Sequence, residues 1–162
     1  MTRKSASGRN RRGRLWEQGW ADHAALRVEV PVVVAFQDAD PTGFTWHGNY
    51  FRYYDTARVA LLSRFDFGYL QMGAQQQIWP IVDTRVRYIR SAGFNSALQV
   101  SAQLVEWEYR LRIYYQIHNA DEELINEAYT VQVPVEAATE TMLFGVPVSV
   151  QDRVQALIES GH

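Results

Sequence analysis

The chain contains no cysteine among its 162 residues. It therefore cannot form a disulfide scaffold, a thiolate zinc site, an iron–sulfur cluster or a cysteine nucleophile. It also has no apolar run of the roughly 18 residues that a membrane-spanning helix needs, and no apolar stretch behind its basic N-terminus of the kind that a secretory signal needs. We expect a cytoplasmic protein that does not bind a membrane.

The motifs of several common enzyme classes are missing as well. G-x-S-x-G and S-x-x-K are absent, which argues against a serine-type hydrolase. H-E-x-x-H is absent and no two of the four histidines are spaced i, i+4, which removes the usual ligands for a catalytic metal. G-x-G-x-x-G and G-x-x-x-x-G-K-[ST] are also absent, so hydride transfer and nucleotide hydrolysis are poor fits.

Hydrophobic residues make up 47% of the chain and aromatic residues 13%, which is enough for one globular domain of this length. The charge is unevenly spread, because residues 1–14 hold six of the 16 basic residues and no acidic one. The remainder has 10 basic and 18 acidic residues. We predict a disordered basic tail over 1–14 and a single domain over 15–162. No helix-turn-helix signal, zinc spacing or RNA-binding aromatic motif is present, so nucleic acid is not an expected partner.

The order of predicted elements is that of an α+β fold. A β-branched run predicts a strand over Val28–Phe36, with Pro31 at its start or on a sheet edge. After a loop, apolar spacing by three and four predicts a long helix from Asn49 to about Phe65. Weaker patterns predict short helices over 15–27 and 151–159, and four strands near 77–90, 97–107, 109–119 and 123–136. The last three strands are typical of an antiparallel meander, so we expect an antiparallel sheet around one buried helix.

One face of the long helix should be buried and the other should meet water. Arg52, Asp55 and Ser63 are expected to face solvent. The buried face is predicted to carry Phe51, Tyr54, Arg58, Leu61, Leu62 and Phe65.

The loop before this helix holds two carboxylates, Asp38 and Asp40, the second fixed in extended geometry by Pro41. The first turn of a helix has unpaired N–H groups and a partial positive charge, so it can hold a carbonyl oxygen or an oxyanion. A carboxylate a few residues upstream can then attack the polarised carbonyl or activate water. The residues also fit a purely structural use, since aspartate commonly serves as a turn or capping residue before a helix.

A longer pattern resembles a known family. The loop reads Asp38-x-Asp40-Pro41-x-Gly43-x-x-Trp46-His47-x-Asn49-Tyr50, and Arg52 and Asp55-x-Ala57-Arg58 follow in the helix. This pattern resembles hotdog-fold acyl-CoA thioesterases of the 4-hydroxybenzoyl-CoA thioesterase type, over roughly residues 28–148. Later segments that fit the same family are Pro80-Ile81-Val82, Tyr88-Ile89-Arg90-Ser91-Ala92, Leu98-x-Val100 and Glu106-Trp107. The resemblance implies a hotdog fold: a five-stranded antiparallel sheet around a central helix, paired as a homodimer or homotetramer with active sites between subunits.

Carried over position by position, the resemblance places the catalytic aspartate at Asp40, with Asp38 the weaker candidate. The backbone N–H that polarises the thioester carbonyl falls at His47. Gly48 and Asn49 shape the turn into the helix, and Trp46 is the aromatic residue most favoured to contact substrate. The resemblance implies catalysis without a metal or redox cofactor.

Other carboxylates and cations remain secondary candidates. Asp55 is spaced for an ordinary ion pair with Arg58, which is the favoured interpretation. Of the basic cluster that contacts nucleotide phosphates in the 4-hydroxybenzoyl-CoA enzyme, only Arg110 keeps its charge here, at Glu108-Tyr109-Arg110. Arg90 or Arg112 are alternative phosphate ligands. The thiol carrier is therefore either coenzyme A or an acyl-carrier protein.

Two other functions stay open at this point. One is a hotdog dehydratase or hydratase acting on 3-hydroxyacyl thioesters, and the other is a non-catalytic protein that binds acyl thioesters. The hydratase needs a histidine and an acid acting on a β-hydroxyl, and the usual signatures are not visible.

Overall fold

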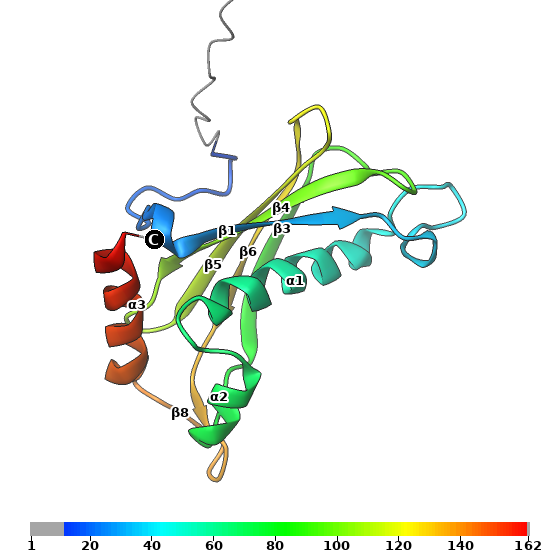
Figure 1. The fold of residues 1–162 in the computed structure, drawn as a ribbon. Helices are drawn as coiled ribbons and strands as arrows, with labels where there is room; N and C mark the ends of the chain where they lie inside the picture. The colour runs from blue at the N-terminus through cyan, green and yellow to red at the C-terminus, as the bar shows by residue number, and fades with distance from the viewer. Residues whose placement is uncertain (1–11, 162) are drawn as a thin grey trace, which may run out of the picture.

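A computed structural model describes residues 12–161 of the chain. Five antiparallel strands form one sheet in the order β1-β4-β5-β6-β3, and one long helix, α1, lies against a face of this sheet (Figure 1). The strands are β1 (Arg27–Val33), β3 (Ile81–Tyr88), β4 (Ala97–Glu106), β5 (Leu111–His118) and β6 (Leu124–Gln132). The expected α+β order and the predicted meander of β4, β5 and β6 are confirmed.

The central helix α1 runs over Tyr50–Ser63, within the predicted range. Its buried positions recur at intervals of three and four, which gives one continuous stripe against the sheet. The buried residues are Tyr50, Tyr53, Tyr54, Ala57, Arg58, Leu61 and Leu62. Phe51 was predicted on this face but is 38% exposed, because it lies on the flank of the stripe that Tyr50 and Tyr54 define.

Proline residues divide two of the predicted strands. The strand expected over 77–90 is split by Pro80 into β2 (Gln77–Ile78) and β3, and that over 123–136 is split by Pro134 into β6 and β7 (Val135–Glu136). Proline has no N–H to donate to a ladder hydrogen bond, so strand pairing is commonly interrupted where it occurs. Pro31 is tolerated inside β1, opposite Gln99, because β1 is an edge strand as predicted.

The smaller elements lie near the C-terminal end of α1. A short helix, α2 (Tyr69–Ala74), was not predicted, and neither was β8 (Thr141–Met142), which forms a small sheet with β2 and β7. The terminal helix α3 (Val148–Ser160) begins three residues earlier than predicted and covers one end of the sheet (Figure 1). Within residues 12–161, no helix is long and apolar enough to cross a membrane.

The segment before β1 packs on the outer face of the sheet, opposite α1. The helix predicted over 15–27 is wrong, since only a 3-10 turn over Ala24–Leu26 is present. Leu15 and the rings of Trp16 and Trp20 instead pack on Val105 and Tyr114 of that face. Trp16 and Trp20 are thus spaced i, i+4 because both contact the sheet, and not because they lie on one face of a helix. Residues 1–11 of the expected tail lie outside the described residues, whereas Arg12 pairs with Asp22.

Candidate active site

The loop between β1 and α1 contains a tight turn built on Asp40. The N–H of Gly43 donates to the carbonyl of Asp40 at 2.9 Å, and the N–H of Asp40 donates to the carbonyl of Phe44 at 2.8 Å. Pro41 occupies the second position, which suits its fixed φ, and Gly43 has a φ of 85° that favours glycine. Asp40 Oδ1 closes the turn by accepting from the N–H of Thr42 at 2.8 Å and from the Thr42 hydroxyl.

This turn uses only one of the two oxygens of Asp40. Among the described residues, Oδ2 accepts no hydrogen bond, and the side chain is half-exposed. The bonds from the hydroxyl and N–H of Thr42 lower the pKa of Asp40, and the N–H of Phe44 and the charge of His47 act in the same direction. Asp40 is therefore ionised at neutral pH and presents one free carboxylate oxygen.

Asp38 has a different role from Asp40 although it is only two residues away. It is 5% exposed, and both of its oxygens are occupied. Oδ1 accepts from Arg52 at 3.2 Å and Oδ2 accepts from the Tyr53 hydroxyl at 3.1 Å. Burial, followed by the charge of Asp38, raises the pKa of Tyr53 to about 12, so this hydroxyl keeps its proton. Asp38 thus anchors the loop to α1.

The main chain of Asp38 fixes the entrance to the helix as well. Its carbonyl accepts from the N–H of Trp46 at 2.9 Å and from the Asn49 side-chain amide at 3.0 Å. A 3-10 turn over His47–Asn49 then leads into α1. In the part of the chain that the structure describes, the backbone N–H groups of His47 and Gly48 donate no hydrogen bond. They are unpaired donors at the positive end of a helix.

Aromatic side chains surround these free amides. The indole of Trp46 lies against the ring of His47, with 4.7 Å between centroids, and is 49% exposed. A Cβ at Gly48 would lie 2.1 Å from Trp46 Cζ3, so a larger residue here would force this ring to move. The hydroxyl of Tyr88 donates to the carbonyl of His47 at 2.9 Å. That carbonyl belongs to the same peptide group as the N–H of Gly48, so Tyr88 orients this donor.

The loop therefore brings Asp40, Trp46, His47, Gly48 and Asn49 together. The sequence predicts neither the hydrogen bonds that Tyr88 and Tyr53 make to this loop nor the pairing of Arg52 with Asp38. A tyrosine near the end of a strand gives no pattern that separates a site residue from a core residue. Arg52 is 63% exposed as expected, but it also holds Asp38.

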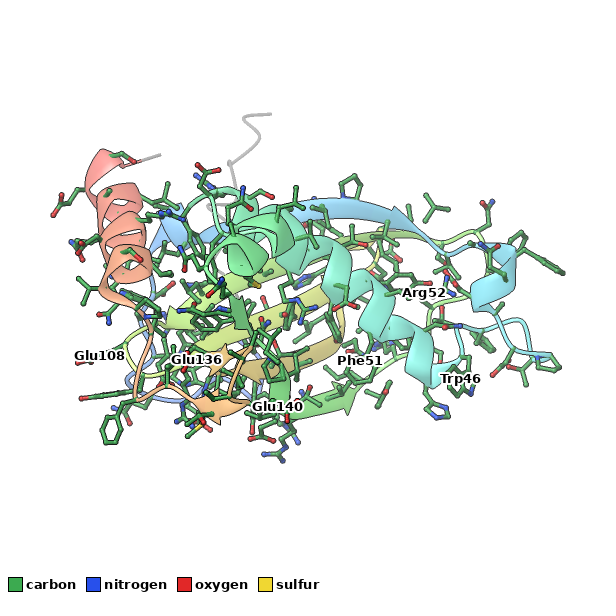
Figure 2. All side chains as sticks on the ribbon, turned by 90° about the horizontal axis from the view of Figure 1, so that it is seen from below. Trp46, Phe51, Arg52, Glu108, Glu136 and Glu140 are labelled. Atoms are coloured by element: carbon green, nitrogen blue, oxygen red, sulfur yellow. The ribbon has the colours of Figure 1, made fainter. Side chains whose placement is uncertain are left out.

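The candidate phosphate ligands are all paired with carboxylates. Arg90 pairs with Glu123 at 3.0 Å and Arg110 pairs with Glu106 at 2.9 Å. Arg110 follows Glu108, and Figure 2 shows Glu108 and Trp46 at opposite ends of the molecule. Arg112 is 9% exposed and contacts Glu106 at 3.4 Å and Glu17 at 3.5 Å.

Asp55 forms the ion pair that its spacing predicts. Its carboxylate lies 2.9 Å from Arg58 and is 59% exposed. Asp55 is two turns along α1 from the free amides of the helix start. Asp55 therefore forms the structural ion pair with Arg58 that the sequence predicts.

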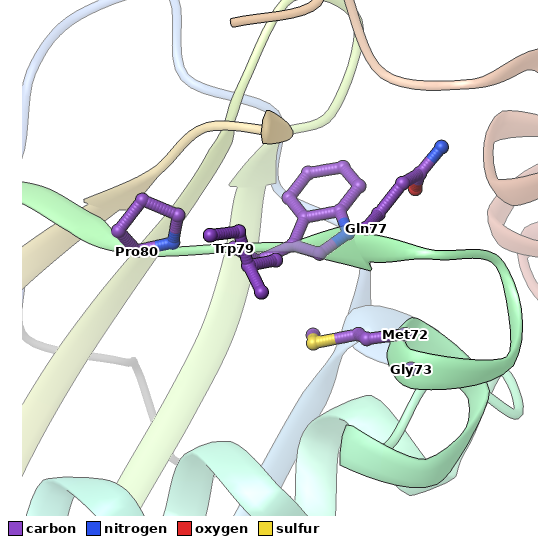
Figure 3. A pocket seen from close by; sticks show the side chains of 6 residues that line it. Met72, Gly73, Gln77, Trp79 and Pro80 are labelled. Atoms are coloured by element: carbon purple, nitrogen blue, oxygen red, sulfur yellow. The ribbon is translucent and has the colours of Figure 1, made fainter. Parts of the chain in front are cut away.

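An apolar cavity of about 360 Å³ lies near the other end of α1, between α2 and the β2–β3 segment. Figure 3 shows Met72 of α2 facing the strand segment that carries Trp79. The cavity is lined by Met72, Gly73, Gln77, Ile78, Trp79 and Pro80.

Comparison with known proteins gives a consistent result. The family model of the thioesterase-like superfamily matches residues 34–158. The chain is 26% identical over 107 residues to the acyl-CoA thioester hydrolase YbgC of Escherichia coli, covering 65% of this chain and 80% of that protein. A DHNA-CoA thioesterase from Staphylococcus aureus has a similar structure, with a TM-score of 0.72 and 24% identity over 84% of this chain and 95% of that chain. A 1,4-dihydroxy-2-naphthoyl-CoA thioesterase from Synechocystis has a TM-score of 0.72 and 17% identity, covering 80% and 96% of the two chains. The expected hotdog fold is confirmed.

Proposed function

The chain belongs to the thioesterase-like superfamily, and on that premise we propose that it hydrolyses an acyl thioester to a free acid and a thiol. Coenzyme A is the first choice of thiol carrier, and an acyl-carrier protein is the alternative. One observation carries the proposal: within residues 12–161, Oδ2 of Asp40 and the N–H groups of His47 and Gly48 form no hydrogen bond, and all three belong to one anchored loop.

In this mechanism the thioester carbonyl oxygen accepts a hydrogen bond from the N–H of His47. The partial positive charge of the helix start stabilises the negative charge that develops on this oxygen. Asp40 Oδ2 either attacks the carbonyl carbon, giving a mixed anhydride that water cleaves, or removes a proton from the attacking water. In both routes the C–S bond breaks, the sulfur leaves as a thiolate that takes up a proton, and the acid keeps the oxygen of water.

The surrounding residues hold these groups in place. Asp38, through Arg52 and Tyr53, fixes the loop against α1, and Tyr88 fixes the peptide that carries the N–H of Gly48. Such fixed donors contribute more than mobile ones because they need no reorganisation during the reaction. The exposed ring of Trp46 is the proposed substrate contact.

We also propose that a second copy of the chain completes the site. The edge strand β3 presents exposed apolar side chains at Ile81, Val82 and Tyr88. Pairing of two β3 strands in antiparallel fashion lays the Ile81 end of one copy beside the Tyr88 end of the other, next to His47. The cavity that begins at Pro80 of one copy then adjoins the loop of the other, and its apolar lining suits an acyl group.

The test is hydrolysis by the full chain of a panel of aliphatic and aromatic acyl-CoAs and acyl-carrier proteins, with released thiol as the readout. Asp40→Asn should lower kcat by about a hundredfold or more, because an amide is neither a nucleophile nor a base. The asparagine oxygen can still accept from Thr42, so the turn and the fold should survive.

Asp55→Asn is the matched control, since it removes a carboxylate from α1 but keeps a side-chain oxygen that can accept from the buried Arg58, and it should leave turnover within about twofold. Near-normal turnover by Asp40→Asn would move the chemistry to Asp38 or Asp55. If no thioester in the panel is hydrolysed by the unaltered chain, the protein is better described as an acyl-thioester-binding protein.

A further inference from the structure

The edge of β3 that faces away from β6 carries two charges of opposite sign. This edge pairs with no strand of residues 12–161. Asp83 and Arg85 lie in the middle of β3, and both side chains are exposed. Neither of them forms an ion pair with another described residue. Charges on an edge strand discourage pairing with other strands unless the incoming strand carries complementary charges.

The side chains of β3 alternate between the two faces of the sheet. Val86 packs on the main core, whereas Arg87 pairs with a buried carboxylate of the outer face. The even-numbered positions of the strand therefore face α1, and Asp83 and Arg85 point to the outer face. The ladder with β6 has no register shift over 83–88, so the alternation is unbroken there.

This alternation restricts how two copies of β3 can pair. In an antiparallel pair about a two-fold axis, opposed side chains lie on the same face, so one residue at the centre is opposite its own copy. A register centred on Asp83 or on Arg85 opposes like charges directly. A register centred on Val86 places Arg85 opposite Arg87 of the other copy. Only a centre at Thr84 places Asp83 of each copy opposite Arg85 of the other.

We propose that Asp83 and Arg85 set the register of a two-fold dimer, with Thr84 opposite its own copy at the centre. Two cross-strand pairs of opposite charge form on the outer face, and the threonine pair lies between them on the face of α1. Both kinds of pair stabilise antiparallel strands. The same register brings the exposed Val82 of one copy beside Val86 of the other.

The register also decides which part of the second copy reaches the candidate active site, and this step rests on the proposed function. It lays Pro80 of one copy beside Tyr88 of the other, whose hydroxyl donates to the carbonyl of His47 at 2.9 Å. Trp79 and Pro80 line the apolar cavity, so the second copy contributes these two residues to the acyl side of the site. A centre one residue away slides the strands by two residues, roughly 7 Å, and separates the cavity from the loop.

The cysteine-free chain allows the register to be measured with single cysteines. A disulfide needs Cα atoms about 4.4 to 6.8 Å apart, a spacing that directly opposed residues of antiparallel strands provide. Thr84→Cys should therefore form a covalent dimer on mild oxidation, read by non-reducing electrophoresis. Val86→Cys is the matched control, because it lies on the same face but not opposite its own copy, and it should stay uncrosslinked. Absence of the Thr84→Cys dimer, or equally fast crosslinking of Val86→Cys, would overturn the register.

Charge reversal tests the pairing of Asp83 with Arg85 in a second way. Asp83→Arg opposes arginines in the homodimer and Arg85→Asp opposes aspartates, so each should raise the dimer Kd at least about tenfold in sedimentation equilibrium. The double variant Asp83→Arg/Arg85→Asp restores both pairs and should return the Kd to within about threefold of the unaltered chain. An equimolar mixture of the two single variants should form a heterodimer, because its charges are again complementary.

Asp152→Arg is the matched control for these variants, since Asp152 is exposed on α3, and it should leave the dimer Kd unchanged. If the charges of β3 serve only to discourage contacts with other proteins, both single variants will dimerise like the unaltered chain, and the proposal is wrong. A double variant that fails to recover the dimer contradicts it as well.

These measurements need no thioester, so they separate the register from the proposed function. With an acyl-CoA as substrate, each single variant should lose turnover at protein concentrations where it is monomeric, and the double variant should regain it. Full turnover by a monomeric variant would overturn the contribution of Trp79 and Pro80 from the second copy. A Thr84→Cys crosslink and recovery of the dimer in the double variant, in a chain that hydrolyses no thioester, would keep the register and reject the thioesterase.

Discussion

Asp38 and Asp40 illustrate how two similar residues in one loop acquire different roles. Asp38 points into the body, where Arg52 and Tyr53 occupy both carboxylate oxygens. Asp40 stays half-exposed at the turn and uses a single oxygen. The turn and the proposed chemistry are therefore compatible uses of Asp40, because they employ different oxygens of the same carboxylate.

The pKa of Asp40 gives a prediction at the residue scale. The Thr42 hydroxyl is the largest cause of the lowered pKa, and the reactive form is the carboxylate. Activity should therefore fall only as the pH drops through that lowered pKa. Thr42→Val removes the hydroxyl but keeps the N–H bond, so the pKa of Asp40 should rise and the acidic limb of the kcat/KM profile should move to higher pH.

Thr42→Ser is the control for this experiment, since it keeps the hydroxyl and should keep the acidic limb in place. The measurement is kcat/KM against pH for the three proteins. An acidic limb that does not move in Thr42→Val would show that Asp40 does not set it.

At the scale of elements, the sequence predicts the long helix α1 best, because many of its residues repeat the same periodic pattern. The long helix was found because its buried positions, from Tyr50 to Leu62, repeat every three or four residues without an interrupting glycine or proline. The segment 15–27 shows the opposite case. Its apolar residues also fit a helix, but Trp16 and Trp20 gain more by packing on the sheet, a tertiary contact that local spacing does not encode.

The sequence likewise predicts one part of the candidate site and misses another. Asp40, His47 and Gly48 are contiguous in one loop, so a linear motif can locate them. Tyr88 reaches His47 from the end of β3, 41 residues away, and the spacing along the chain contains no record of that contact. Sequence reasoning therefore found the loop but not the strand residue that orients it.

The contact between α1 and the sheet supports a stability prediction. Leu61 is completely buried in the main core, whereas Val59 on the same helix is 44% exposed. Leu61→Ala should lower the free energy of unfolding by about 2 to 5 kcal/mol, because it leaves a cavity under the helix. Val59→Ala is the matched control and should change it by less than about 0.5 kcal/mol. Urea denaturation measures both, and equal losses would contradict the packing described.

At the scale of the whole molecule, the outer edge of β3, which pairs with no strand of the described residues, predicts self-association. An exposed apolar edge strand is a template for pairing with another strand, and a closed two-fold dimer satisfies it. The chain should be a dimer or a dimer of dimers at micromolar concentration by light scattering. Val82→Lys places a charge on this edge and should shift the protein towards the monomer with loss of activity.

Val59→Lys, on the exposed flank of α1, is the control and should leave the mass unchanged. A monomeric unaltered chain would contradict both the dimer and the proposal that a second copy completes the site.

Part of the N-terminal segment, from Gly13 onward, packs on the outer face of the sheet and should contribute to stability. Glu127 is completely buried there and accepts from the N–H of Leu15 at 2.8 Å, from the Tyr114 hydroxyl at 2.8 Å and from Arg87 at 3.1 Å. The N–H of Gly13 donates to the Tyr114 hydroxyl at 3.0 Å, and a Cβ at Gly13 would lie 1.4 Å from the Glu127 carboxylate.

The last prediction follows from these contacts and compares two truncations. Residues 1–11 carry four basic side chains and no acidic one, a composition that contributes little to a core, so their removal should leave the melting temperature and acyl-CoA turnover unchanged. Removal of residues 1–16 also deletes the buried Leu15 and a donor to the buried Glu127 carboxylate, which should cost about 2 to 4 kcal/mol of stability.

If residues 1–11 steer an acidic carrier protein, their removal should slow carrier-bound turnover mainly at low salt, where charges are least screened. A shorter truncation that lowers the melting temperature as much as the longer one would show that the first 11 residues pack on the body, and their expected dispensability would be wrong.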